Sequence, residues 1–378
     1  MRRGCALPLA VAVALAATPA ISQQPAEPAP GEPPRAALAN ASPRSLAEQI
    51  GPRFGGELAR EKIEIREAPA AERRTTAAQW IEEAFAPLAA PACRPVLEAA
   101  RIPPGMPPGL AETWPEDRPA AARTGVLLVP DRLPPLGPAQ AETLTRTGLL
   151  PIEIALTGEW VRAAGVGHAG PPAADPLLRL ARAARLEGAA RLAGIVAVVG
   201  GSGVDPERLG AGLLEMDRDA AGWPRGALLA SATDDVRRAL LRVLVEDGLR
   251  WALLHYVKAG LPGLLAAMES PAAGPADLLR PGLRLRVDGV PADGCHLGPR
   301  AAAVLLAGTD DPPWVDQLRL DSFSAGTGGR VGAVLGFESD AAASRAAGEL
   351  RDSGWQASAQ GHLLRVEGVP TTARSKAP

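Results

Sequence analysis

The sequence predicts an α+β fold that is mostly helical. Apolar residues recur three or four positions apart over 234–260, which indicates the longest helix. A second long helix is predicted over 176–199, capped by Asp175 and stopped by Gly200-Gly201. Strand-like residues gather near the carboxyl end. They predict strands at 331–337, 355–359 and 362–366, with a helix at 340–350 between the first two strands. We therefore expect a helical core followed by a C-terminal β-α-β-β unit.

Shorter elements complete this expectation. A helix capped by Thr75 or Thr76 should run to Phe85, and another should run over 151–165, because Pro151 interrupts the longer helical pattern there. The apolar run 125–129 predicts a buried strand. The chain thus supplies helices along most of its length and strands in only two places.

The amino end predicts export. Two arginines precede the apolar run 5–17, and the small residues Ala20 and Ser22 precede a cleavage point. Residues 1–22 are therefore interpreted as a signal peptide, and the protein is expected in the periplasm or outside the cell. The alternative is that this segment stays as a short membrane anchor. No later apolar run is long enough to span a bilayer, so no transmembrane segment is expected after cleavage.

Composition shifts suggest the domain boundaries. Residues 23–45 are rich in Pro and Ala and predict a disordered linker. A mainly helical domain is expected over 46–310, and the β-α-β-β unit, packed on it, over 311–370. The last residues, 371–378, are expected to form a loose tail.

Charge and composition exclude several classes of function. The net charge is −2, from 40 basic and 42 acidic residues, which argues against a protein that binds nucleic acid through a basic excess. Aromatic residues make up only 3% of the chain, so few platforms for a sugar substrate are available to a glycosidase. The core must be built mainly from Ala, Leu and Val.

Two cysteines remain after the signal peptide, Cys93 and Cys295. In an oxidising compartment they can form a disulfide that closes a long loop. Two buried free thiols are the alternative, and the sequence does not decide between them.

Common catalytic motifs are absent. The spacing H-E-x-x-H does not occur, and no two histidines share a helical turn. The sequence also lacks G-x-S-x-G. The glycines at 200–203 lack the ending of a phosphate-binding loop and are interpreted as a helix stop. Isolated glutamates such as Glu153, Glu159 and Glu187 are most simply solvated helix residues.

Three stretches, in this order, resemble a family of secreted bacterial zincin-like metalloproteases. They are LLPIEIALTGE at 149–159, LEGAA at 186–190, and the region 246–281, which begins EDGLRW and ends in LLRP. The resemblance extends over about residues 120 to 370. It implies a zincin-like helical core, with Glu153 at the position of the catalytic glutamate and Glu187 at the position of the third zinc ligand.

The departures from the family decide the expected function. The resemblance places Ile152 and Leu156 at the two histidine ligand positions, and neither can bind a metal. Arg280 stands where the family has a loop histidine. Without zinc, Glu153 has no activated water to deprotonate. The resemblance therefore implies a scaffold without cofactor, metal or catalysis.

We accordingly expect an exported, catalytically inactive protein, a pseudo-metalloprotease that acts as a binding or scaffold module for an unidentified protein or peptide. Two alternatives stay open. One is a hydrolase with an unrecognised site, for example a metal held by His168, His296 and Glu187. The other is an envelope interaction or structural protein without protease ancestry, which uses an edge strand of the C-terminal unit to pair with a partner.

Overall fold

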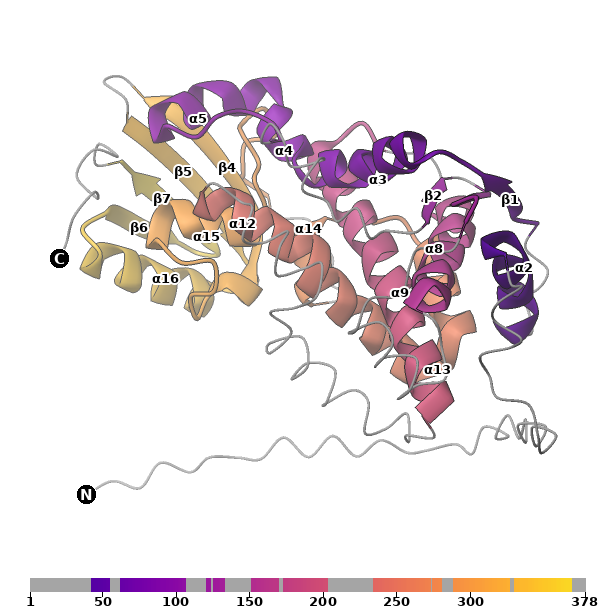
Figure 1. The fold of residues 1–378 in the computed structure, drawn as a ribbon. Coiled ribbons are helices and arrows are strands. Elements are labelled where there is room, and N and C mark those ends of the chain that lie inside the picture. Colours follow the sequence, from indigo (N-terminus) through magenta and orange to yellow (C-terminus); the bar gives the residue numbers. More distant parts are fainter. Residues whose placement is uncertain are drawn as a thin grey trace. The chain divides into compact units, whose positions relative to one another are not determined.

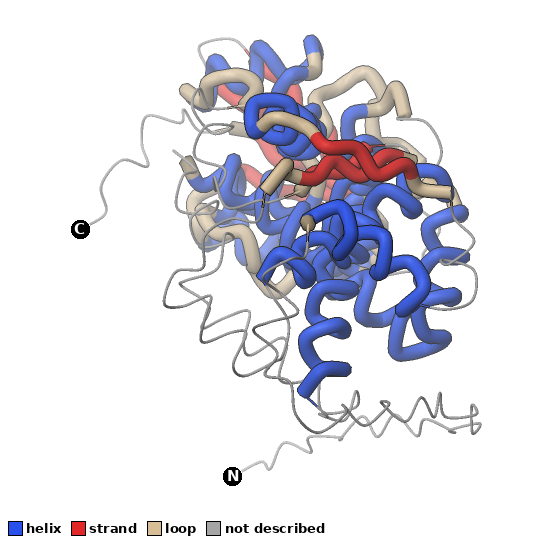
Figure 2. The backbone as a smooth tube through the Cα atoms, turned by 45° about the vertical axis from the view of Figure 1, so that its right-hand side comes forward, coloured by secondary structure: helices blue, strands red, loops and turns tan. Residues whose placement is uncertain are grey.

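The computed structural model describes most of the chain from Ser42 onward (Figure 1). The described ranges are 42–54, 62–106, 120–123, 125–132, 151–169, 173–202, 234–272, 274–280, 288–326 and 330–368. The expected signal peptide, nearly all of the expected linker and the expected tail lie outside these ranges. The predicted fold class is confirmed: the described residues form a mostly helical α+β structure with two separate sheets (Figure 2).

The helical core is built around α9 (Pro176–Ser202). Asp175 caps its amino end as expected, since its carboxylate accepts the backbone N–H of Leu177 at 2.7 Å. The helix continues through the expected stop at Gly200-Gly201. Buried residues lie on every side of α9 between Leu180 and Ala193, which is the pattern of a helix enclosed by neighbours.

Two long helices pack against α9, namely α8 (Pro151–His168) and α13 (Gly248–Glu269). The predicted helix over 234–260 begins as expected, because Asp234 accepts the backbone N–H of Arg237. It is, however, divided into α12 (Asp235–Arg242), a π-helical turn (Val243–Asp247) and α13. A kink follows at Gly260, whose φ of 64° is left-handed.

The amino-terminal helices begin earlier than expected. Helix α2 (Pro43–Phe54) starts within the expected linker, because Ser42 accepts the backbone N–H of Ser45 and caps it. Helix α3 (Ala70–Ala84) starts after Pro69, not at Thr75 or Thr76. Short helices then lead away from it: α4 (Ala86–Ala89), η2 (Pro91–Cys93) and α5 (Arg94–Ala100).

A small three-stranded sheet covers part of this core. The expected strand at 125–129 is β3 (Val126–Val129). It lies between β1 (Glu64–Glu67), which runs parallel to it, and β2 (Ala121–Arg123), which runs antiparallel. These two partners were not predicted, since a strand of three or four residues is too short to show a pattern.

The C-terminal sheet has the order β4-β5-β7-β6. Its predicted members are β5 (Arg330–Phe337), α16 (Asp340–Asp352), β6 (Gln356–Gln360) and β7 (Leu363–Glu367). A further strand, β4 (Leu318–Gly326), pairs with β5, so the expected β-α-β-β unit is a β-β-α-β-β unit. Helix α16 lies along β6 and β7 (Figure 1).

The C-terminal unit is joined covalently to the helical part. Cys93 and Cys295 form a disulfide with their Cα atoms 4.4 Å apart, and both residues are fully buried. Cys295 also forms a β-bridge to Phe323 of β4. Helices α14 (Pro275–Leu279) and α15 (Pro299–Ala307) and the turn η4 (Val315–Gln317) connect the two parts. The described residues from Ser42 onward belong to one compact unit.

Candidate functional site

The residues that the resemblance assigns to a metal site lie on α8 and α9. The two helices cross in an antiparallel sense, because Ile154 lies against Gly194 whereas Arg162, further along α8, pairs with Glu187, earlier in α9. The chain therefore runs in opposite directions along α8 and α9 where the two helices pack.

This arrangement keeps the four predicted positions apart. Glu187 meets Arg162, and Ile152 lies ten residues earlier on α8, about 15 Å away along the helix axis. Leu156 is six residues before Arg162, about 9 Å along the axis. Ile152 and Leu156 are buried apolar residues, as expected, and Glu153 is also buried. Arg162, and none of these three residues, is thus the α8 residue that bonds to Glu187 in the contacts described above.

A buried charge cluster occupies the crossing instead. Arg162 donates from Nε to Glu159 at 3.1 Å and from Nη2 to Glu187 at 2.5 Å. Arg191 donates to the other oxygen of Glu187 at 2.8 Å. Arg162 and Glu187 are each 1% exposed and Glu159 is 5% exposed. Two carboxylates are thus held by one fully buried guanidinium and one at the rim.

The surroundings keep this guanidinium charged. Burial by itself lowers the pKa of Arg162, but Glu159 and Glu187 outweigh it and hold that pKa above its ordinary value. The guanidinium lies 5.6 Å from the ring centre of Trp80 on α3, within the range of a cation–π contact. The Trp80 ring is fixed in turn, since its Nε1 donates to the carbonyl oxygen of Ala122 at 3.1 Å.

The backbones approach closely beside the cluster. A Cβ atom on Gly158 would lie 2.7 Å from the carbonyl oxygen of Ala190. Any larger side chain at residue 158 would force α8 and α9 apart. The backbones of α8 and α9 are therefore in direct contact at Gly158 and Ala190, next to the charged cluster.

Two members of the alternative metal set, His296 and Glu187, have described side chains, and each is bonded elsewhere. His296 contacts the backbone carbonyl of Asp321 through Nδ1, whereas Glu187 is held by two arginines. The side chain of His168 lies outside the described residues. Over the described ranges, no group of three or more His, Cys, Asp and Glu side chains is placed to hold a metal ion. Arg280, which the resemblance aligns with a loop histidine, pairs with Glu338 of the C-terminal unit.

A second buried arginine joins α9 to the turn after α13. Arg185 donates to Asp277 at 2.5 Å and to the carbonyl oxygen of Ser270 at 2.8 Å. It lies 4.9 Å from the ring centre of Trp251, which contacts His255. Burial, and then the charge of Arg185, lower the pKa of His255, so this imidazole favours its neutral form.

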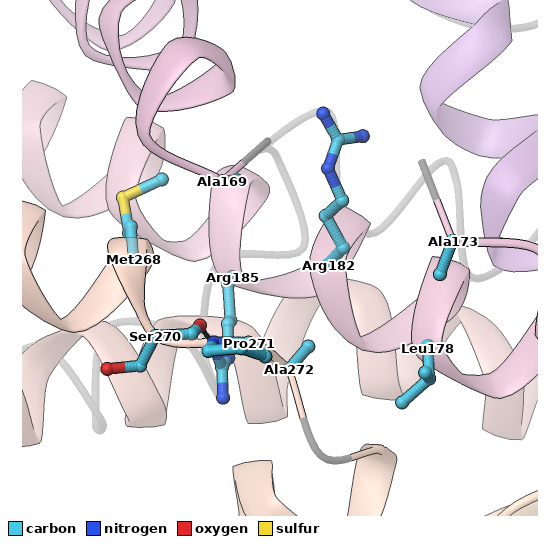
Figure 3. A pocket seen from close by; sticks show the side chains of 9 residues that line it. All are labelled: Ala169, Ala173, Leu178, Arg182, Arg185, Met268, Ser270, Pro271 and Ala272. Atoms are coloured by element: carbon cyan, nitrogen blue, oxygen red, sulfur yellow. Dashed lines mark hydrogen bonds between the residues drawn. The ribbon is translucent and has the colours of Figure 1, made fainter. Parts of the chain in front are cut away.

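A pocket of about 140 Å³ lies between α9 and the turn after α13 (Figure 3). The side chains of Arg182 and Arg185 leave α9 in opposite directions there, so their guanidinium groups do not converge (Figure 3). The pocket is lined by a largely apolar set: Ala169, Ala173, Leu178, Arg182, Arg185, Met268, Ser270, Pro271 and Ala272. This volume is below the usual size of a small-molecule site, about 300 to 1,000 Å³.

A third buried pair supports the π-helical turn. Arg300 on α15 donates two hydrogen bonds to Asp247, both at 2.6 Å. Asp247 is the last residue of that turn and is 2% exposed. A bidentate pair of this kind fixes geometry as well as charge. It therefore positions α15 against the end of the irregular turn.

The sequence analysis did not identify Arg162. A signal was present, because Glu159 and Arg162 are the only charged residues between Glu153 and His168 and stand three positions apart on a predicted helix. Two opposite charges at this spacing in an apolar helix indicate a buried pair. Their partner Glu187 was identified, but for another role.

In the part of the chain that the structure describes, no helix combines the length and apolarity needed to cross a bilayer. Comparison of the chain with protein-family models, curated proteins and solved structures finds no significant match. The likeness to zincin-like metalloproteases therefore rests on the three sequence stretches.

Proposed function

We propose that this protein is an exported, catalytically inactive relative of zincin-like metalloproteases that acts as a binding or scaffold module. The observation that carries the proposal is the buried pairing of Arg162 with Glu159 and Glu187. A hydrolytic zinc needs three protein ligands and an open position for water. A buried guanidinium between the carboxylates leaves neither.

The pocket beside Met268 supports a role in binding a protein or peptide. Its volume of about 140 Å³ has room for one side chain of a partner. Its walls are largely apolar, with Arg182 and Arg185 as the charged groups, so we place recognition of an apolar side chain of a protein or peptide there.

Metal analysis and a peptidase assay test this proposal on the purified, chelator-washed chain. We expect less than a tenth of an equivalent of transition metal and no peptide hydrolysis above background, with or without added zinc. One tightly held equivalent of transition metal, or hydrolysis that a chelator abolishes, would contradict the proposal.

One observation favours a second candidate, an envelope interaction module without protease ancestry. Strand β6 is an edge strand that pairs with β7, and no strand pairs with its other edge within the described residues. Edge strands offer backbone groups to a partner strand. A photo-crosslinker at Gln356, compared with one at the exposed Glu98, tests this in intact cells: a partner captured only from Gln356 supports it, and equal capture from both positions contradicts it.

A further inference from the structure

The geometry of α8 and α9 selects one register of the family motif over another. Read with Glu159 as the motif's glutamate, the two ligand positions of H-E-x-x-H are Gly158 and Arg162. Arg162 touches Glu187, the position of the third ligand, whereas Ile152 lies about 15 Å further along the helix. The contacts therefore favour the register 158–162.

The residues in this register do not fit zinc. Gly158 has no side chain to offer, and a Cβ there would already lie 2.7 Å from the carbonyl oxygen of Ala190. Arg162 carries a positive charge at every physiological pH and repels a cation. Of the three ligand positions in this register, only Glu187 offers a group that zinc accepts, and the neighbouring carboxylate of Glu159 adds one more, which is too few for a structural or catalytic zinc site.

We infer that the Arg162 guanidinium takes the place of a divalent cation between Glu159 and Glu187. This inference rests on the proposed function, since it names the group that fills the former metal position. Three features carry it. Arg162 is 1% exposed, it donates to both carboxylates, and the face of Trp80 lies within cation–π distance of it. The two buried anions need a positive partner, and the chain supplies one from its own side chain.

Removing that partner should expose a latent metal site. In an Arg162→His variant, an imidazole and the carboxylates of Glu159 and Glu187 border the same space and offer three ligands of two types that zinc accepts. The full chain carrying this change should bind about one equivalent of Zn²⁺ after chelator washing and dialysis. Zinc should raise its melting temperature by roughly 3 °C or more relative to the same sample in chelator.

Two controls isolate the cause. Arg191→His also places an imidazole next to Glu187, but Arg162 remains in position, so no zinc-dependent shift is expected. The double variant Arg162→His with Glu187→Gln loses one ligand, so the zinc response of Arg162→His should disappear. The unmodified chain should not respond to zinc.

A folded Arg162→His chain with no zinc-dependent shift overturns the inference, as does an equal shift in Arg191→His. If Arg162→His folds only when zinc is added during refolding, the inference is supported; if it stays unfolded with zinc as without it, the inference is overturned. These results leave the proposed function untouched, because that depends on the metal content and activity of the unmodified chain.

Discussion

Helix α9 crosses its two long neighbours in contrasting ways. Against α8 it buries the guanidinium of Arg162 between Glu159 and Glu187. Against α13 it has almost nothing between the backbones: a Cβ on Gly188 would lie 1.9 Å from the carbonyl oxygen of Gly248, and one on Gly248 would lie 2.0 Å from that of Ala184. The first crossing combines buried charges with a close backbone approach at Gly158, whereas the second has close backbone approaches at Gly188 and Gly248.

The difference shows two ways in which the relative position of two packed helices can be fixed. The α13 crossing tolerates no added atom, because backbone atoms cannot move aside as a flexible side chain can. The α8 crossing tolerates no missing charge, because a buried anion without its partner is very unfavourable. Gly188 on α9 packs directly on the backbone of Gly248 on α13.

The largest effect should come from Arg162→Ala, which breaks the α8 crossing. Removing the guanidinium leaves Glu159 and Glu187 buried together, and we expect a loss of about 3–5 kcal/mol in the free energy of unfolding. Urea denaturation followed by circular dichroism measures it. Arg94→Ala is the control: its pair with Glu98 is exposed, so the change should be below about 0.5 kcal/mol. Equal losses in the two variants would show that the buried charges carry no special weight.

Gly188→Ala should damage the α13 crossing by a comparable but smaller amount. The added Cβ meets the backbone of Gly248, so we expect a loss of about 1–3 kcal/mol although alanine is the better helix former. The matched control is Gly348→Ala in α16, where an added Cβ meets nothing within 4 Å and should stabilise by up to about 1 kcal/mol. A higher melting temperature for Gly188→Ala would contradict the close crossing.

A charge-free cluster should separate electrostatics from packing. The triple variant Glu159→Gln, Arg162→Met and Glu187→Gln removes the buried ions together, so it should unfold within about 2 kcal/mol of the unmodified chain. It should therefore be clearly more stable than Arg162→Ala, in the same urea titration. A triple variant as unstable as the single one would mean that the shape of the arginine, and not the charge balance, holds the crossing.

The smallest change in the free energy of unfolding is expected at Arg191, at the edge of the charged cluster. Arg191 is partly exposed, and Glu187 keeps its bond to Arg162 when Arg191 is replaced. Arg191→Ala should therefore lower stability by about 1 kcal/mol or less. A loss that approaches that of Arg162→Ala would show that the two arginines act as one unit.

Sequence patterns predicted the long elements well, because α9, α12, α13 and the C-terminal elements each repeat an apolar period several times. Strand β4 was missed for a physical reason. Asp321 lies buried in the middle of it, where alternation would suggest a loop, and its carboxylate accepts the backbone N–H groups of Leu297 and Gly298. These partners are more than twenty residues away in the sequence, so no local pattern reports them.

The candidate site was predicted only in part. Glu187 and Glu159 were noted as helix residues, and α8 and α9 were predicted, but the bonding of both glutamates to Arg162 was not. Local spacing cannot report this cluster, because the bond between Arg162 and Glu187 joins residues 25 positions apart on two helices.

The disulfide determines how the chain responds when force is applied to its two ends. Because Cys93 and Cys295 are covalently joined across a sequence separation of 202, tension passes directly from one to the other, and the chain between them bears none of it. Helices α8, α9 and α13 all lie inside this sheltered loop. Pulling can therefore unfold the segments outside the loop while the contacts of α9 with α8 and α13 stay intact. Those contacts would bear tension only after the disulfide is reduced.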